Sequence, residues 1–176
     1  MIISTDLGLN GFIAFCKIDQ GKFNVIKTSK IITQSKNHNL IIKTKTKSIV
    51  QNQIDYTKNY NQILDELDEE EHIGLYEQIT TRPFNSAVSS MSLSDTSATF
   101  RCIFESLDIH YNIIPPKNWK NFLGLTSDKK ESQQLFKKLV EQKEINILFK
   151  KNIRNHNEIE SILIAYYYYC INKKIL

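Results

Sequence analysis

Short apolar runs separated by turn residues open the chain and predict strands. Residues 2–6, 11–18 and 22–28 are rich in Ile, Phe and Val, and glycines fall in both gaps between them. Runs of this length, joined by short glycine-containing turns, are typical of antiparallel hairpins. We therefore expect three consecutive strands at the start, followed by loop with some additional strand over the polar residues 29–45.

Helical spacing alternates with further strand-like runs in the rest of the chain. In order, we expect a helix over residues 47–69, a strand over 72–76, a helix over 86–107, a strand over 109–114 stopped by Pro115-Pro116, an amphipathic helix after an Asp128–Glu131 capping box, and a last helix from about His156 to about Ile171. This order predicts an α/β fold, a mixed sheet flanked by helices, in a single domain spanning residues 1–176.

The expected helix over residues 86–107 is apolar on two opposite sides. At about 100° per residue, Met91, Ala98 and Cys102 fall on one side, and Leu93, Phe100, Phe104 and Leu107 on the other. The sheet can cover one side, whereas the other needs a second layer of this chain or a second subunit. Small residues let two helices approach closely, so we assign Met91, Ala98 and Cys102 to a homodimer interface.

The charge is distributed unevenly along the chain. The formal net charge is +4, but a cluster of six acids over residues 65–71 hides an excess of +10 elsewhere. Residues 116–176 carry twelve Lys/Arg against six Asp/Glu. A basic C-terminal part is typical of a protein that binds a polyanion, although a merely solvated surface gives the same pattern. We expect the acidic cluster to face away from such a partner.

The cysteines and the apolar content bear on location. Cys16, Cys102 and Cys170 are far apart and lack the spacing of a metal site. The longest apolar stretch, residues 162–171, is too short to cross a bilayer. We expect buried thiols in a reducing compartment and no membrane association. The expected location is cytoplasmic, at the nucleoid or, for a viral protein, in the host cytoplasm.

Three carboxylates stand where different elements end or begin. Asp6 and Glu77 each follow an apolar strand, and Glu160 enters the last helix. Acids that converge repel one another and are normally held together by a cation. This pattern predicts metal-dependent chemistry on phosphate, with Mg²⁺ as the ion that prefers such oxygens and Asp6 as the central ligand. His156 and Asn157 precede Glu160 by one helical turn, and either could complete the site, with Glu158 as a competing acid.

Several sequence motifs in a fixed order resemble one protein family. They are Glu77 after a strand, Pro83, Ser89-Ser90-Met91, Pro116-Lys117-Asn118-Trp119-Lys120, Leu123-Gly124, Asp128-Lys129 and Leu135-Phe136, with DLGLNG at the start and NHNEIESILIA at the end. In this order they are similar to the phage and bacterial RuvC-type Holliday junction resolvases. The similarity covers nearly the whole chain except roughly residues 30–70.

The resemblance implies an RNase H-like fold, a homodimer and two divalent ions per site. It also implies structure-selective cleavage of four-way DNA junctions in recombination and repair. Within it, Asp6, Glu77, Glu160 and His156 are the catalytic candidates, and Asn157 joins the three acids as a metal ligand. Asn157 stands where related resolvases place Asp or His, and this loss of charge could select Mn²⁺ over Mg²⁺.

Branched DNA as the partner makes basic side chains the candidates for phosphate contacts. The candidates are Lys117, Lys120, Lys129, Lys130, Lys137 and Lys138, with Lys150, Lys151 and Arg154 beside the last helix. Phe84 is a candidate for insertion into an opened junction, and core packing is its alternative. We expect Trp119 to anchor its loop on the core. Two other functions compete with junction resolution: another RNase H-like nuclease acting on flaps, forks or RNA–DNA hybrids, and a DNA-binding module whose site has decayed.

Overall fold

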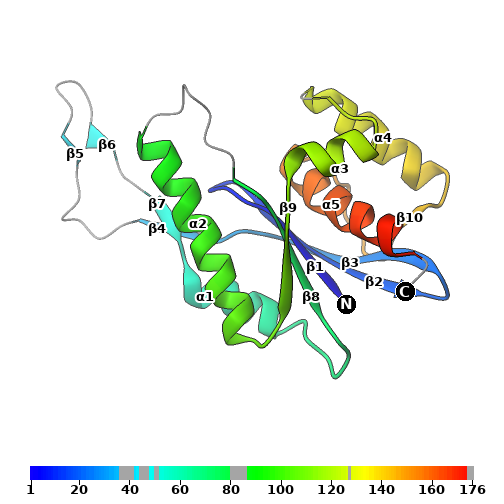
Figure 1. The fold of residues 1–176 in the computed structure, drawn as a ribbon, viewed down its shortest axis with the longest axis horizontal. Coiled ribbons are helices and arrows are strands. Elements are labelled where there is room, and N and C mark those ends of the chain that lie inside the picture. Colours follow the sequence, from blue (N-terminus) through cyan, green and yellow to red (C-terminus); the bar gives the residue numbers. More distant parts are fainter. Residues whose placement is uncertain (36–41, 44–47, 50–51, 80–86, 127, 174–176) are drawn as a thin grey trace.

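A six-stranded mixed sheet forms the centre of the protein (Figure 1). The computed structural model describes residues 1–35, 42–43, 48–49, 52–79, 87–126 and 128–173. The strand order is β10-β3-β2-β1-β8-β9. The strands are β1 (Ile2–Asp6), β2 (Phe12–Asp19), β3 (Lys22–Lys30), β8 (Ile73–Glu77), β9 (His110–Ile114) and β10 (Ile145–Ile147).

The strand pairing confirms the predicted hairpin series. β1 to β3 pair antiparallel in sequence order, whereas β8 runs parallel to β1 and β9 runs parallel to β8. Parallel pairs need crossover connections, and α2 (Ala87–Ser106) supplies the one between β8 and β9. The expected mixed α/β sheet is therefore present.

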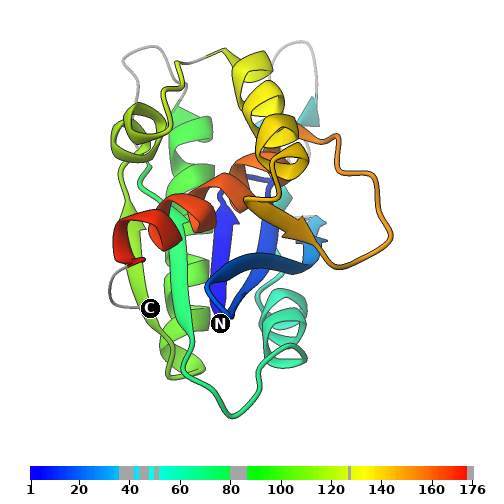
Figure 2. The same ribbon diagram turned by 90° about the vertical axis from the view of Figure 1, so that its right-hand side faces the viewer.

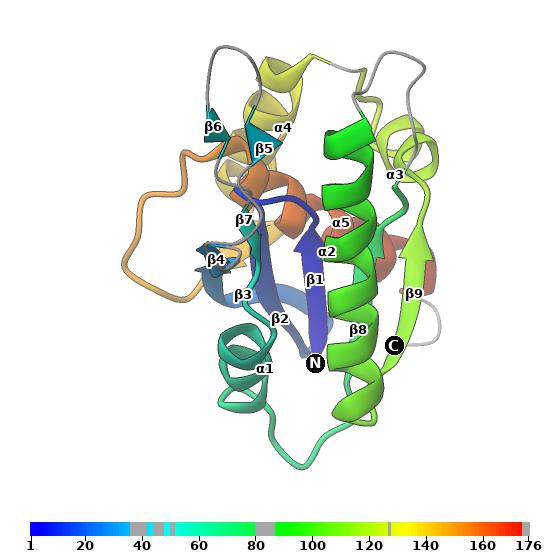
Figure 3. The ribbon, with the colours of Figure 1, turned by 90° about the vertical axis from the view of Figure 1, so that its left-hand side faces the viewer.

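Helices cover both faces of the sheet. α1 (Tyr56–Leu64) and α2 lie on one face, in front of the strands in Figure 3. α3 (Pro116–Phe122), α4 (Lys129–Glu141) and α5 (His156–Asn172) lie on the other, with α5 crossing the strands in Figure 2. None of the helices within the described ranges combines the length and the apolar content that crossing a bilayer requires.

Alternation along the central strands builds two cores. On β2, Ile13 and Phe15 face the α2 layer, while Ala14 and Cys16 face the α5 layer. All four side chains are fully buried. A strand that is covered on both faces has a nearly continuous apolar sequence. The sequence therefore predicts these strands clearly.

Of the two apolar faces predicted for α2, one is buried and the other is exposed. Phe100, Ile103 and Phe104 are fully buried against the sheet. Ala98 and Cys102 are exposed on the opposite side. Met91 lies within α2, but its side chain is outside the described part of the protein.

The expected helix over residues 47–69 is wrong at both ends. Asn52–Ile54 forms strand β7, which pairs with β4 (Thr33–Ser35), and a short hairpin of β5 (Ile42–Lys43) and β6 (Ser48–Ile49) precedes it. α1 starts only after Asp55, whose carboxylate accepts a hydrogen bond from Lys58 N at 3.1 Å. It ends at Leu64, because the acids that follow oppose the helix dipole at a C-terminus.

The sequence did not predict two short elements, α3 and β10. α3 begins with Pro116 in its first turn, a position where proline is favoured. From the sequence, Pro115-Pro116 was interpreted only as the end of the preceding strand. β10 has three residues, too few to show a period.

The acidic cluster over residues 65–71 has a structural partner. Lys17 on β2 forms an ion pair with Asp68 and lies 3.5 Å from Glu70, and Lys27 on β3 lies 2.5 Å from Glu66. These contacts fasten the α1–β8 connection to the sheet. The connection returns the chain to the start of β1, where Ile73 N donates to Met1 O at 2.9 Å. The cluster thus lies toward the opposite end of the sheet from Asp6.

Candidate active site

Asp6 and Glu77 end two neighbouring parallel strands. Thr5 on β1 is in register with Tyr76 on β8, so the next residue of each strand is one of the two acids. Carboxyl ends of parallel strands meet at the same edge of a sheet. The strand register thereby brings the two acids to one edge.

A tight glycine turn follows Asp6 and fixes its backbone. Gly11 N donates to Gly8 O at 3.0 Å, and Ile31 N donates to Gly11 O at 2.9 Å. A Cβ on residue 11 would lie 2.0 Å from the backbone oxygen of Asp6, far inside any real contact. The turn predicted from the sequence is present, and a side chain at position 11 would displace the end of β1.

Glu77 is held by the only tryptophan of the chain. The Trp119 Nε1 donates to Glu77 Oε1 at 2.9 Å, and the indole ring is fully buried. Trp119 therefore anchors α3 in the core, as expected. Its hydrogen bond to an acid 42 residues earlier was not foreseen, because spacing within a motif carries no information on such a distant partner.

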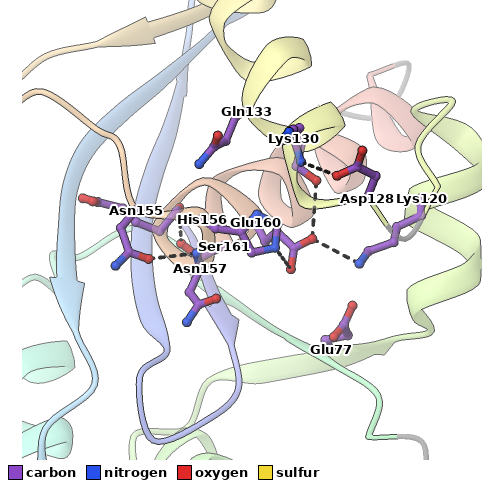
Figure 4. A network of polar contacts seen from close by, with 12 residues as sticks. Glu77, Lys120, Asp128, Lys130, Gln133, Asn155, His156, Asn157, Glu160 and Ser161 are labelled. Atoms are coloured by element: carbon purple, nitrogen blue, oxygen red, sulfur yellow. Dashed lines mark hydrogen bonds and ion pairs between the residues drawn. The ribbon is translucent and has the colours of Figure 1, made fainter.

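Glu160 lies on the first turns of α5 and has three polar neighbours (Figure 4). Its Oε1 lies 3.1 Å from Lys120 Nζ and accepts a hydrogen bond from Ser132 Oγ at 3.4 Å. Its Oε2 lies 3.3 Å from His156 Nε2. Figure 4 shows Lys120 reaching from α3 toward Glu160, on the side where Glu77 lies.

Lys120 lies inside the candidate site, which the sequence did not predict. The sequence places it among the phosphate contacts, yet only a quarter of its side chain is exposed and its ammonium group lies against Glu160. It also lies 5.0 Å above the Trp119 ring. One helix, α3, thus brings an indole to Glu77 and an ammonium group to Glu160.

The pKa of the Asp6 carboxyl reflects the nearby charges of the other two acids. Burial raises the pKa of the Asp6 carboxyl well above its usual range, and the charges of Glu160 and Glu77 raise it further. Lys120 and Lys129 act in the opposite direction but do not offset the rise. Asp6, Glu77 and Glu160 therefore interact at one end of the sheet.

The donor set suits a hard divalent cation. Carboxylate oxygens are the ligands of Mg²⁺, and an imidazole extends the set to softer ions such as Mn²⁺. Within the described ranges, however, no three His, Cys, Asp or Glu side chains already form a cluster that could hold an ion. Lys120 supplies part of the positive charge that the acids require.

The other two candidates for a fourth metal ligand, Asn157 and Glu158, are engaged in contacts elsewhere. Asn157 Nδ2 donates to Asn10 O at 2.9 Å, which ties α5 to the turn after β1. Glu158 is buried on the β3 side of α5, where it pairs with Lys151 at 2.5 Å and accepts a hydrogen bond from Thr28. Because its carboxylate is engaged there, we do not retain Glu158 as a ligand.

The start of α4 supports the site rather than forming the full capping box that was expected. Asp128 accepts from Lys130 N at 2.9 Å, as a cap should. Glu131 instead accepts from the Thr126 amide and hydroxyl, both at 2.7 Å. These contacts lie at the start of α4, from which Ser132 reaches Glu160.

The expected DNA-contacting residues are mostly on the surface. Lys117, Lys129, Lys130, Lys137, Lys138, Lys150, Lys151 and Arg154 are exposed. Lys129 and Lys130 open α4 beside Glu160, and Lys151 and Arg154 lie just before α5. Phe84 is outside the described residues.

The raised pKa of Asp6 makes a prediction about stability. A carboxyl whose pKa is higher in the folded than in the unfolded state makes stability fall as pH rises between about 3.9 and the raised value. In chelator, Asp6→Asn should be more stable than wild type at pH 7, by on the order of 1 kcal/mol or more, and no more stable at pH 3. Urea unfolding at both pH values measures this. Asp19→Asn, at an exposed position of β2, is the control, and an equal pH dependence of Asp6→Asn and wild type would contradict the prediction.

Comparison with known proteins finds similarity at the level of structure. No family profile matches the chain, and no curated protein matches it in sequence. The yeast mitochondrial Holliday junction resolvase Ydc2 superposes with a TM-score of 0.63 at 13% identity, over 99% of this chain and 85% of that one. Thermus thermophilus RuvC in complex with a Holliday junction substrate gives 0.60 at 9% identity, and RuvC alone 0.60 at 11%, each over 99% of this chain and 95% of the other. The chain therefore has the RNase H-like fold of the Holliday junction resolvases RuvC and Ydc2.

Proposed function

We propose that this protein is a metal-dependent endonuclease that resolves four-way DNA junctions by paired phosphodiester cleavage. The observation that carries the proposal is the meeting of Asp6, Glu77 and Glu160 at one end of a sheet whose fold is that of junction resolvases. Residues 1–176 act as a single nuclease domain. We expect the protein in the compartment that holds its DNA, the cytoplasm or nucleoid, with the organelle of the mitochondrial yeast neighbour as the alternative.

Asp6, Glu77 and Glu160 would hold the metal, with His156 as the fourth ligand. Two Mg²⁺ ions, or Mn²⁺ ions as the alternative, would supply Lewis acidity toward the attacking water and the leaving oxygen. The chain's own groups prepare the site. Trp119 orients Glu77, and Lys120 and Ser132 orient Glu160.

The basic side chains would contact the DNA backbone. Lys129 and Lys130 begin α4, and the exposed Lys151 and Arg154 precede α5, so phosphates on either side of the acids meet positive charge. Contacts of this kind give affinity without sequence preference and weaken as salt is raised. Specificity for branched DNA then has to come from the shape of the substrate.

A second candidate is a DNA-binding module whose metal site has decayed. Two observations favour it: Lys120 lies against Glu160, and no ready metal cluster exists in the part of the chain that the structure describes. An ammonium group among acids can substitute for a metal ion in the folded state. Divalent-dependent cleavage separates this candidate from the enzyme.

We also propose a homodimer built on the outer face of α2. Ala98 and Cys102 are exposed there, while the opposite face is buried against the sheet. Paired cuts in a four-way junction need two sites related by a two-fold axis, and a C₂ interface supplies that axis.

Neutralising the acids should abolish cleavage and spare binding. Asp6→Asn, Glu77→Gln and Glu160→Gln should each reduce the single-turnover rate by at least about 10³-fold, because they remove metal ligands rather than phosphate contacts. The assay compares a four-way junction with a fork, an RNA–DNA hybrid and a linear duplex, with Mg²⁺ and with chelator. Glu69→Gln, at an exposed position between α1 and β8, is the control. Near-normal turnover in any one of the three variants would remove that residue from the site, and faster cleavage of the hybrid would favour another nuclease.

His156 should matter more than Asn157. An imidazole can bind a metal or transfer a proton near neutral pH, whereas the Asn157 amide is already bonded to Asn10 O. His156→Ala should therefore lower the single-turnover rate at least about tenfold more than Asn157→Ala. A larger loss in Asn157→Ala would make the amide the fourth ligand and leave His156 as a structural group.

An Ala98→Arg change should separate the protomers. A charged, bulky side chain on the outer face of α2 should give a folded monomer that binds Mg²⁺ yet cannot make paired cuts. Sedimentation at micromolar concentration and a cruciform plasmid assay measure the two effects. Arg101→Ala, on the exposed surface of the same helix, is the control. A monomeric wild type, both free and on junction DNA, would refute the interface.

A further inference from the structure

A half-open groove of about 820 Å³ lies beside the candidate active site. It is bounded by α4, by the first turns of α5 and by the segment after β10, which swings outward next to α4 in Figure 2. The proposed function uses two residues of its rim, Lys151 and Arg154, and none of its floor.

The floor of the groove is apolar and partly aromatic. Phe136 and Ile159 are buried at its base, and Phe149, Ile153 and Val140 are half-buried along it. These side chains belong to the edge of the α5-side core, so the floor is part of a packed structure and not a loose loop. Such a surface is suited to a flat, apolar group.

The rim of the groove is polar and mostly basic. Lys137, Lys151 and Arg154 line it, and Glu141 is the acid among them, 3.8 Å from Lys137. Two amides, Gln133 and Asn152, stand between the charges. Gln133 Nε2 donates to Arg154 O at 3.4 Å, which joins α4 to the opposite wall.

The groove is lined by the same two helices that hold Glu160. Gln133 of its rim follows Ser132, whose hydroxyl donates to Glu160, and Ile159 of its floor immediately precedes Glu160 on α5. Arg154 of the rim comes two residues before His156. A strand bound at Glu160 would therefore meet two elements that also line the groove.

We propose that the groove takes up one unpaired nucleobase of the strand that is bound at the acids. The base would lie on Phe136 and Phe149, its edge would meet the amides of Gln133 and Asn152, and the phosphates of that strand would meet Arg154. This inference rests on the proposed function. It adds a reason for selectivity, because a base inside a duplex is not free to enter.

An acidic, apolar peptide is the other occupant that the charges would admit. The rim amides favour the base, since they match the donors and acceptors of a base edge, which an apolar side chain lacks. The shared helices favour the base as well, because a DNA strand at the acids would bring its own bases to α4 and α5, which line the groove.

The test places 2-aminopurine, one position at a time, at the nucleotides flanking the branch point of a four-way junction. The full-length protein binds these junctions in chelator, so that no cleavage occurs. At one position the emission should rise at least about threefold on binding, as the base leaves its stack. Phe149→Ala should remove this rise and weaken binding about tenfold. A junction that is abasic at that position should bind wild type and Phe149→Ala equally.

Two further variants keep the test decisive. Gln133→Ala changes an exposed residue of α4 and should reduce the rise even where Phe149→Ala fails to fold, whereas Gln134→Ala, at an exposed position of the same helix outside the groove, should leave it unchanged. No rise at any position, or a rise that survives both groove variants, overturns the proposal.

The remaining outcomes separate this inference from the proposed function. A second assay uses a fluorescent peptide of alternating Glu and Phe. If this peptide binds the wild type, binds Phe149→Ala more weakly and does not compete with junction DNA, the groove belongs to a protein partner and the proposal is overturned. A junction that is cut normally without base capture would overturn the groove proposal alone. A protein that neither binds nor cuts any branched DNA would overturn both.

Discussion

Mutual repulsion among buried carboxylates is the constraint on which the rest of this structure depends. Asp6 is buried at the end of β1 with Glu77 and Glu160 near enough to raise its pKa, so the folded chain must offset the energy of holding negative charges together. Hydrogen bonds and an ammonium group from the α3–α4 region contribute to this. Trp119 satisfies Glu77, and Lys120 and Ser132 satisfy Glu160.

The sheet can impose this arrangement because it is packed on both faces. β1 and β2 are covered by α2 on one side and α5 on the other, so the end of β1 cannot move away from its neighbours without opening a core. The Gly8–Gly11 turn leaves no room for a side chain near Asp6 O. Rigid strands and a close turn thus fix the acids before any ligand arrives.

The sequence predicted what depends on local pattern and missed what depends on distant contacts. The central strands and α5 were recognised because apolar runs bury both faces, and Asp6, Glu77 and Glu160 were selected because they end or begin such runs. The helix expected over 47–69 was wrong, since Ile54 pairs with β4 as a strand and helical spacing cannot reveal that pairing. The roles of Trp119 and Lys120 could not be predicted, because both contacts join segments about 40 residues apart.

The hydrogen bond from Trp119 to Glu77 gives the protein an optical property. The chain contains one tryptophan, its ring is buried, and its Nε1 is bonded to one of the three acids. The emission of an indole depends on the charge and the hydrogen bonding next to it. The chain also has eight tyrosines, but excitation at wavelengths that only an indole absorbs selects Trp119. The tryptophan emission of the unlabelled protein therefore comes from a single reporter inside the candidate site, and a cation that bound to Glu77 would change it without any added probe.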